Sequence, residues 1–198
     1  MIWLAVALLV CAVRGAVELR GAWLATVLNI DWPSEPGLPM RVQQQQLADA
    51  IDEMAQLNLN MVVFQVRPTA DALYESAIEP WSRFITGTQG ESPGWDPLAF
   101  AVERAHSHGM ELHAWINPFR AGKGDLDRSK LAPNHMANDP VFKDVVYEYG
   151  DQLWADPGVT VVRERVHAVV DDIAQRYAVD AIHMDDYFYP YPTAQEFP

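Results

Sequence analysis

Short, almost continuous apolar runs alternate along the chain with longer stretches in which apolar residues recur every third or fourth position. Continuous runs of roughly four to eight apolar residues, bounded by Pro, Asn or Asp, are typical of buried strands, and the wider spacing is typical of amphipathic helices. The pattern therefore predicts buried strands at Leu19–Val27, Asn60–Val66, Met110–Ile116 and Val179–Met184.

Three helices are predicted between these strands. The first, Val42–Leu57, carries apolar residues at helical spacing, with Gln and Asp between them. The other two each open on an Asp-Pro pair, at Asp96-Pro97 and Asp156-Pro157. In such pairs Asp caps the helix and Pro takes its first position. We expect the second helix to end at Gly109 and the third near Tyr177.

The alternation of strands and helices predicts an α/β fold with parallel strands and crossover helices. The first strand-to-helix turn, Ala25–Met40, contains only Gly37, which disfavours a doubly wound dinucleotide-binding sheet. We therefore predict a (β/α)8 TIM-barrel type of fold. Such barrels need about 250 residues. Because the chain has 198 residues, we expect it to contain only the first four βα units. Residues 16–198 would then be the N-terminal half of a barrel domain, and we expect this half to be inactive alone.

The amino-terminal segment has a different composition from the rest of the chain. Met1–Val13 is almost wholly apolar and is followed by Arg14-Gly15-Ala16. This run is too short to span a bilayer and is typical of a secretory signal peptide, here predicted at residues 1–15. The alternative is a buried first strand. Cys11 is the single cysteine, so the mature chain would have neither a disulfide nor a thiol nucleophile.

Composition narrows the classes of partner. Hydrophobic residues make up 49% of the chain and charged residues 21%, which is ordinary for a globular protein. The formal net charge of −13 argues against nucleic acid and anionic membrane surfaces, because phosphate binding needs an excess of Lys and Arg. An acidic surface says little about a neutral substrate such as a sugar.

The last predicted strand runs directly into two adjacent carboxylates, Asp185 and Asp186, and a cluster of aromatic residues. Strand alternation places His183 and Asp185 on the same face. In parallel α/β proteins the carboxyl ends of strands usually house the chemistry, so Asp185 is our first candidate for a catalytic residue, with Asp186 beside it. The alternative interpretation is a turn or helix-cap pair after a strand.

If the strands form a barrel, their carboxyl ends meet at one mouth with further polar and aromatic side chains. The candidates for substrate binding are Gln65, Arg67, Asp71, His113, Asn117, His183, Trp32, Trp81, Tyr187 and Tyr189. Aromatic rings stack on sugar faces while planar polar groups bind hydroxyls, so the set favours carbohydrate. Several of these residues have a simpler alternative interpretation: buried, hydrogen-bonded histidines, a loop cap for Asp71, and turns at Arg67-Pro68 and Asn117-Pro118. No metal site with zinc-type spacing is predicted.

Several motifs, in order, resemble the glycosyl-hydrolase-like family ten of bacterial envelope proteins. They are Arg20–Leu24, Asp31-Trp32-Pro33, Phe64–Pro68 with Asp71–Tyr74, Glu79–Ser82, His113–Pro118 and Asp185–Pro190. The resemblance implies a TIM-barrel glycosidase. It also implies a peptidoglycan substrate, because a member of that family acts at the division site on peptidoglycan glycan strands stripped of their peptides.

These observations lead to the hypothesis that the protein is an exported glycoside hydrolase of the periplasm or cell envelope. We expect it to need no cofactor and to cleave a polysaccharide, for which the resemblance points to peptidoglycan glycan. Glycosidic cleavage needs a carboxylate that takes or stabilises positive charge at the anomeric carbon. Asp185 would be this nucleophile or charge stabiliser, and Asp186 would orient it or hold a hydroxyl. Two alternatives stay open: a non-catalytic glycan-binding barrel, and a metal-dependent deacetylase or amide hydrolase with His113, His183 and Asp185 as ligands.

Overall fold

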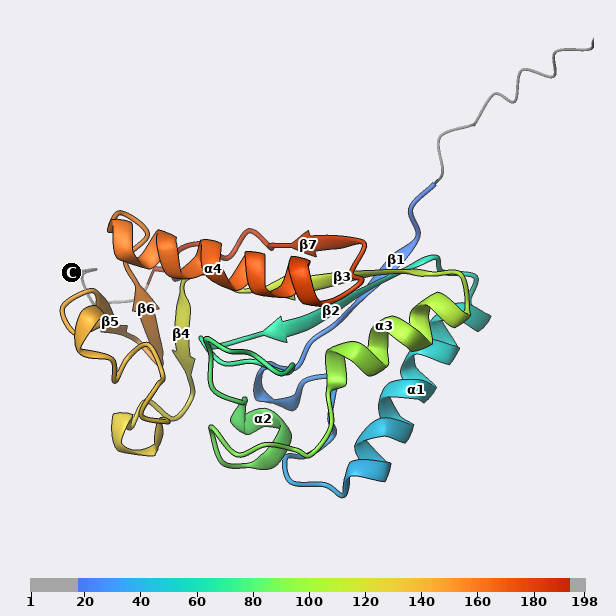
Figure 1. Cartoon of the computed structure of the whole chain (residues 1–198), viewed down its shortest axis with the longest axis horizontal. Coiled ribbons are helices and arrows are strands. Elements are labelled where there is room, and N and C mark those ends of the chain that lie inside the picture. Colours follow the sequence, from blue (N-terminus) through green and yellow to red (C-terminus); the bar gives the residue numbers. More distant parts are fainter. Residues whose placement is uncertain (1–17, 193–198) are drawn as a thin grey trace, which may run out of the picture.

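The computed structural model describes residues 18–192, organised around a four-stranded parallel sheet (Figure 1). Each strand pairs in parallel with the next of these four along the chain. The strands, in spatial order, are β1 (Gly21–Leu24), β2 (Met61–Arg67), β3 (Glu111–Ile116) and β7 (Ala181–His183). All four predicted strands are confirmed within a few residues, and the fold is of the α/β class with a parallel sheet.

Three long helices connect the strands, namely α1 (Met40–Gln56), α3 (Pro97–Ser107) and α4 (Thr160–Arg176). Their fully buried residues, such as Ile51, Ala101 and Val169, join one apolar core with Phe64 of β2 and Ala114 of β3. The three helices therefore pack on the same face of the sheet. The shorter elements are α2 (Arg83–Thr86) and the 3-10 turns η1 (Val27–Asn29), η2 (Arg128–Lys130) and η3 (Pro140–Phe142).

The two Asp-Pro pairs behave differently. Asp96 caps α3 as predicted, because its Oδ1 accepts a hydrogen bond of 2.9 Å from the backbone N–H of Ala99. Asp156 does not cap a helix. Its Oδ1 accepts from the N–H of Gly158 at 2.7 Å, which closes a turn, and α4 begins only at Thr160. The predicted start of this helix was therefore three residues early.

Strand β3 shows how alternation separates the two faces of the sheet. Leu112, Ala114 and Ile116 are fully buried beneath the helices, whereas His113 and Trp115 lie on the opposite face and stay partly exposed. On β2 the register with β3 shifts between Gln65 and Arg67. This bulge breaks the simple alternation that would have placed Gln65 and Arg67 on one face.

A second sheet lies in the segment between β3 and α4, where the sequence analysis predicted neither a strand nor a helix. It is antiparallel, with the strand order β4 (Arg120–Lys123), β6 (Gln152–Ala155) and β5 (Val146–Tyr149). A separate apolar cluster that includes Phe142, Leu153 and Val162 supports it. Figure 1 shows this sheet beyond the carboxyl ends of the parallel strands, so it stands beside the edge where site residues were predicted.

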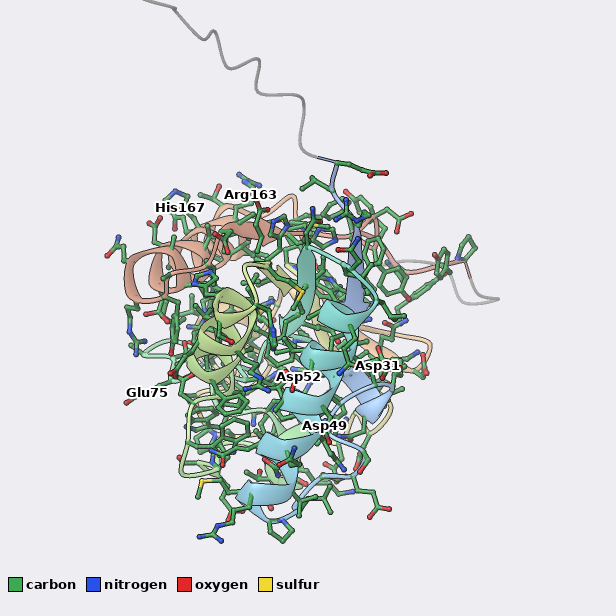
Figure 2. All side chains as sticks on the ribbon, turned by 90° about the vertical axis from the view of Figure 1, so that its right-hand side faces the viewer. Asp31, Asp49, Asp52, Glu75, Arg163 and His167 are labelled. Atoms are coloured by element: carbon green, nitrogen blue, oxygen red, sulfur yellow. The ribbon has the colours of Figure 1, made fainter. Side chains whose placement is uncertain are left out.

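Helices α1 and α3 are also joined by charge. Asp52, labelled on α1 in Figure 2, accepts hydrogen bonds from Arg104 at both carboxylate oxygens, and its Oδ1 lies 2.8 Å from Nε2 of His108. The side-chain hydrogen bond from Arg104, although opposed by burial, lowers the pKa of Asp52. These contacts of Asp52 join α1 to the carboxyl-terminal end of α3.

Within residues 18–192, no helix is both long and apolar enough to cross a membrane. The predicted signal peptide at residues 1–15 lies outside the described residues.

Candidate active site

A cleft of about 310 Å³ opens at the carboxyl end of the parallel sheet. The loop after β1, strands β2, β3 and β4, and the segment after β7 all contribute to it. Its lining residues are Ala25, Val27, Ile30, Gln65, Trp115, Arg120, Asp185, Asp186, Tyr187 and Tyr191. The structure thus brings four of the predicted site residues, Gln65, Asp185, Asp186 and Tyr187, into one cleft.

Asp185 lies two residues beyond the end of β7 and is held by three hydrogen bonds. Its Oδ2 accepts from the indole Nε1 of Trp115 at 3.1 Å and from Nδ2 of Asn117 at 2.9 Å. Its Oδ1 accepts from the backbone N–H of Tyr187 at 3.0 Å. Because Oδ2 has two donors and Oδ1 only one, Oδ1 keeps the larger capacity to accept from, or react with, a ligand. Asp186, its neighbour, is exposed.

Asn117 links Asp185 to the interior of the protein. It is fully buried, and its Oδ1 accepts from Nε2 of Gln65 at 2.6 Å and from Nη2 of Arg120 at 2.8 Å. The amide oxygen is therefore occupied by two donors while the amide nitrogen donates to Asp185. Asn117 supports the carboxylate instead of presenting a free amide to a ligand.

Arg120 is the one described cation that lines this cleft. Its Nε donates to the carbonyl of Pro68 at 2.9 Å, and its guanidinium lies over the ring of Tyr187, 5.6 Å from the centroid. Burial lowers the pKa of Arg120, and the negative charge of Asp185 opposes this effect. Because a guanidinium stays protonated in proteins, Arg120 supplies a fixed positive charge near Asp185.

Aromatic rings form one side of the cleft. The ring of Tyr187 packs edge-on against Trp154 at 5.2 Å and tilted against Tyr191 at 5.0 Å, and its hydroxyl accepts from Nε2 of Gln152 at 2.7 Å. Tyr191 is 70% exposed. An exposed ring beside a carboxylate is a surface on which the apolar face of a sugar can pack.

The two predicted histidines lie on the sheet face that the helices leave open. Nε2 of His183 accepts from the indole N–H of Trp23 at 3.2 Å, and Nε2 of His113 lies 3.0 Å from the carboxylate of Glu111. Burial lowers the pKa of His183, and the charge of Asp185 opposes this. The neutral form agrees with its role as acceptor. Among residues 18–192, no three His, Cys, Asp or Glu side chains gather as a metal site would require.

Trp32 lies in the core, not at the cleft. Its ring is 1% exposed, packs edge-on against Phe64 and Trp95, and donates its Nε1–H to the carbonyl of Gln43 at 3.0 Å. This corrects the expectation of a sugar-stacking platform, because neither face of the ring is free.

Arg67 and Asp71 are also buried away from the cleft. This corrects the prediction that these two residues bind substrate. Arg67 is 1% exposed and its Nη2 forms an ion pair with Glu79 at 3.0 Å. Asp71 is fully buried; its Oδ1 accepts from the backbone N–H and hydroxyl of Thr69, and its Oδ2 from Gln89. Their hydrogen-bonding groups hold the loop after β2, as the loop-cap alternative for Asp71 had proposed.

Trp81 and Tyr189 lie outside the cleft as well. Trp81 lines a separate hollow of about 290 Å³ together with Glu75 and Trp95. Tyr189 is 63% exposed and is not part of the cleft lining. Both rings are accessible, so their predicted roles in binding a longer ligand stay predictions.

The prediction assigned no role to Arg120, Tyr191 or Trp115, three residues that line the cleft. The sequence does indicate a place for Trp115 at the cleft, because strand alternation puts it on the same face as His113 and Asn117 at the end of β3. Tyr191 belongs to the aromatic run after Asp186. Arg120 lies in the segment for which no strand was predicted, and only the position of β4 brings it to Asp185.

The fold and the cleft define an α/β protein with a hydrogen-bonded carboxylate and aromatic rings at the carboxyl edge of a parallel sheet. Residues 18–198 match the sequence profile of the family described as glycosyl hydrolase-like 10. The chain belongs to this family, which confirms the resemblance found in its motifs.

Two curated relatives show the same relationship. The chain is 46% identical over 182 residues to the glycosyl hydrolase YngK of Bacillus subtilis (strain 168), covering 91% of this chain and 35% of YngK. It is 39% identical over 189 residues to the glycosyl hydrolase DigH of Escherichia coli (strain K12), covering 89% of this chain and 43% of DigH. The chain thus spans less than half the length of these relatives.

Among solved structures, a noncanonic maltogenic α-amylase, AmyB from Thermotoga neapolitana, is similar with a TM-score of 0.50. The match covers 91% of this chain and 39% of the amylase, at 14% sequence identity. At this identity the likeness concerns the fold alone.

Proposed function

We propose that the protein acts as a glycoside hydrolase in which Asp185 is the nucleophile or charge stabiliser at the anomeric carbon. The observation that carries the proposal is the placement of Asp185 in an aromatic-sided cleft at a strand end, with three donors that orient its carboxylate. Glycosidase transition states resemble oxocarbenium ions, and a fixed carboxylate opposite the anomeric carbon stabilises their charge. Membership of a glycosyl hydrolase-like family supports the same class of reaction.

We further propose that the four parallel strands are part of a (β/α)8 barrel, with residues 16–198 as its N-terminal half. The consecutive strand order and the packing of α1, α3 and α4 on one face support a barrel, because doubly wound sheets carry helices on both faces. Active sites of such barrels lie at the carboxyl ends of the strands, where the cleft is found.

For the substrate we propose a cell-envelope polysaccharide, specifically peptidoglycan glycan strands. The family and the aromatic side of the cleft support carbohydrate, and the narrower choice rests on the resemblance of the motifs to envelope glycosidases. The proposal includes export to the periplasm or cell envelope, with residues 1–15 as the signal peptide.

The test uses the complete natural chain with peptide-free peptidoglycan glycan strands, and measures new reducing ends. We expect cleavage by the wild type. Asp185→Asn keeps the size of the side chain but removes its negative charge, so turnover should fall at least about 1000-fold. Co-sedimentation with the strands should change little, because most of the cleft is unaltered. Thermal unfolding of both proteins checks that the variant folds.

Other outcomes would replace the proposal. Full turnover by Asp185→Asn would remove Asp185 from the mechanism. Binding of the strands without any cleavage by the wild type would favour the glycan-binding barrel. Zinc-dependent release of acetate or of an amine, with stoichiometric zinc in the protein, would favour the metal-dependent hydrolase. In the structure, however, Nε2 of His113 already contacts Glu111 and Nε2 of His183 already contacts Trp23.

A further inference from the structure

Gln65 occupies the point where the loop after β1 meets the residues that support Asp185. It borders the cleft, yet none of its surface is exposed. Its Oε1 accepts from the backbone N–H groups of Thr26 and Val27 at 2.8 and 2.9 Å, and its Nε2 donates to Oδ1 of Asn117 at 2.6 Å. A side chain that has no exposed surface and whose amide oxygen and nitrogen both already bond to the protein is not placed to bind a substrate hydroxyl. The structure therefore does not support the predicted role of Gln65 in binding substrate, and its contacts indicate a role in supporting Asp185.

The two backbone N–H groups determine the orientation of the whole series of amides. Only an oxygen can accept from Thr26 and Val27, so the amide nitrogen of Gln65 must face Asn117. The atom of Asn117 that receives this donor must then be its oxygen. Arg120, which has donors alone, approaches the same oxygen at 2.8 Å and enforces the same choice. The nitrogen of Asn117 is left to donate to Asp185 at 2.9 Å.

This arrangement gives Asp185 a donor that cannot turn into an acceptor. A free asparagine amide can rotate by 180° and present its oxygen, which would repel the carboxylate. With Gln65 in place, rotation would break hydrogen bonds to two donors inside a buried site, where unpaired polar groups are costly. Misplacement of a reacting group by about 1 Å can cost 100-fold in rate, so a fixed donor matters for turnover.

We propose that Gln65 is a positioning residue that holds the carboxylate of Asp185 in its reactive orientation by fixing the amide of Asn117. The inference rests on the proposed function, since it assumes that Asp185 is the reacting carboxylate. It assigns Gln65 an effect on kcat and not on the binding of substrate.

Two substitutions in the complete chain separate positioning from simple support of the loop. Gln65→Glu keeps an oxygen for Thr26 and Val27 but presents a second acceptor to Asn117, which favours the rotated amide. Gln65→Met removes both contacts. If Gln65 only anchored the loop, Gln65→Glu would be the milder variant. If it positions Asp185, Gln65→Glu must be at least as damaging to kcat as Gln65→Met.

Gln43 provides a matched control. It is also a buried glutamine, 3% exposed, and its side chain contacts three residues, Leu38, Ile85 and Trp95. Gln43→Met should therefore destabilise the protein in the same way as Gln65→Met, but away from the cleft.

With glycan strands as substrate, we expect kcat to fall about 10- to 100-fold in both Gln65 variants, with KM within about twofold of the wild type. Gln43→Met should keep its kcat at temperatures where it is folded. A milder effect of Gln65→Glu than of Gln65→Met, or equal kcat in Gln65→Met and Gln43→Met, would overturn the inference while leaving the proposed function intact. An inactive wild type, or an active Asp185→Asn variant, would overturn the proposed function and this inference with it.

Discussion

A buried cluster of charges outside the cleft lining allows a quantitative test of the structure. Oε1 of Glu79 accepts from Nη2 of Arg67 at 3.0 Å and from Nε of Arg165 at 3.2 Å. The side chains of Glu79 and Arg67 are 0% and 1% exposed, and that of Arg165 is 16% exposed. Burial acts to raise the pKa of Glu79, but the charges of Arg67 and then Arg165 outweigh it and hold this pKa below its usual value. Glu79 is therefore ionised at neutral pH.

Glu79→Gln keeps the shape of the side chain and removes its charge. Arg67 would then be a buried cation without a counterion, and loss of one partner of a buried pair costs about 3–5 kcal/mol. Arg165 keeps its hydrogen bond of 2.8 Å to the carbonyl of Ile78 and has some access to water, so the lower end of this range applies. We expect the free energy of unfolding to fall by about 3 kcal/mol at pH 7.

The pH dependence follows from the direction of the pKa shift. Because the pKa of Glu79 is lower in the folded protein than in the unfolded chain, its stabilising effect is complete above the unfolded value of about 4.3. The effect disappears as the pH falls through the folded pKa. The difference between wild type and Glu79→Gln should therefore be largest at neutral pH and shrink in acid.

Urea unfolding followed by tryptophan fluorescence, from pH 7 to the lowest pH at which the wild type is folded, measures both effects. Asp125→Asn is the control, since it removes an exposed ion pair with Lys130 and should leave the unfolding free energy unchanged. A loss below about 1 kcal/mol for Glu79→Gln at pH 7, or a loss independent of pH, would show that the pair is not the buried network described here.

Two further substitutions test a helix cap and the aromatic side of the cleft. Asp96→Ala removes the cap of α3 and should cost about 1–2 kcal/mol in urea unfolding. Burial and the carboxylate of Asp96 both raise the pKa of Tyr177, so ultraviolet titration should show this phenol ionising at lower pH in the variant. Tyr187→Phe loses the contact with buried Gln152 and should cost about 1 kcal/mol, with an unchanged KM for glycan strands. Tyr187→Ala should raise KM several-fold, and an unchanged KM would exclude the ring from binding.

The parallel sheet and its helices were predictable because their apolar spacing is regular. β2 is a nearly continuous buried run, β3 alternates buried residues with partly exposed ones, and α1 and α3 repeat their buried residues at helical spacing. The antiparallel sheet was not predictable in this way. Its strands have four residues each, and β4 contains two charged residues and a glycine, so no run was long enough to indicate a strand.

The positions of site residues were predicted correctly where the neighbouring sequence determines them, and incorrectly where contacts with distant residues determine them. Asp185 follows from its place just beyond the end of a strand. Trp32, in a proline-rich loop, has the same local pattern whether exposed or buried, and it is buried because Gln43, Phe64 and Trp95 surround it. Arg67 was misplaced by a bulge that alternation does not reveal.

The hydrogen bonds that hold Asp185 have a consequence for how the protein folds. The donors from Trp115 and Asn117 lie 70 and 68 residues earlier in the chain, and Gln65 lies a further 52 residues before Asn117. Contacts between such distant residues close large loops and form slowly. The carboxylate is therefore oriented only after β2, β3 and β7 have all come into register. Protection of the indole N–H of Trp115 from hydrogen exchange would report completion of the site during refolding, and it should appear later than protection of the backbone N–H groups within α1 or α3.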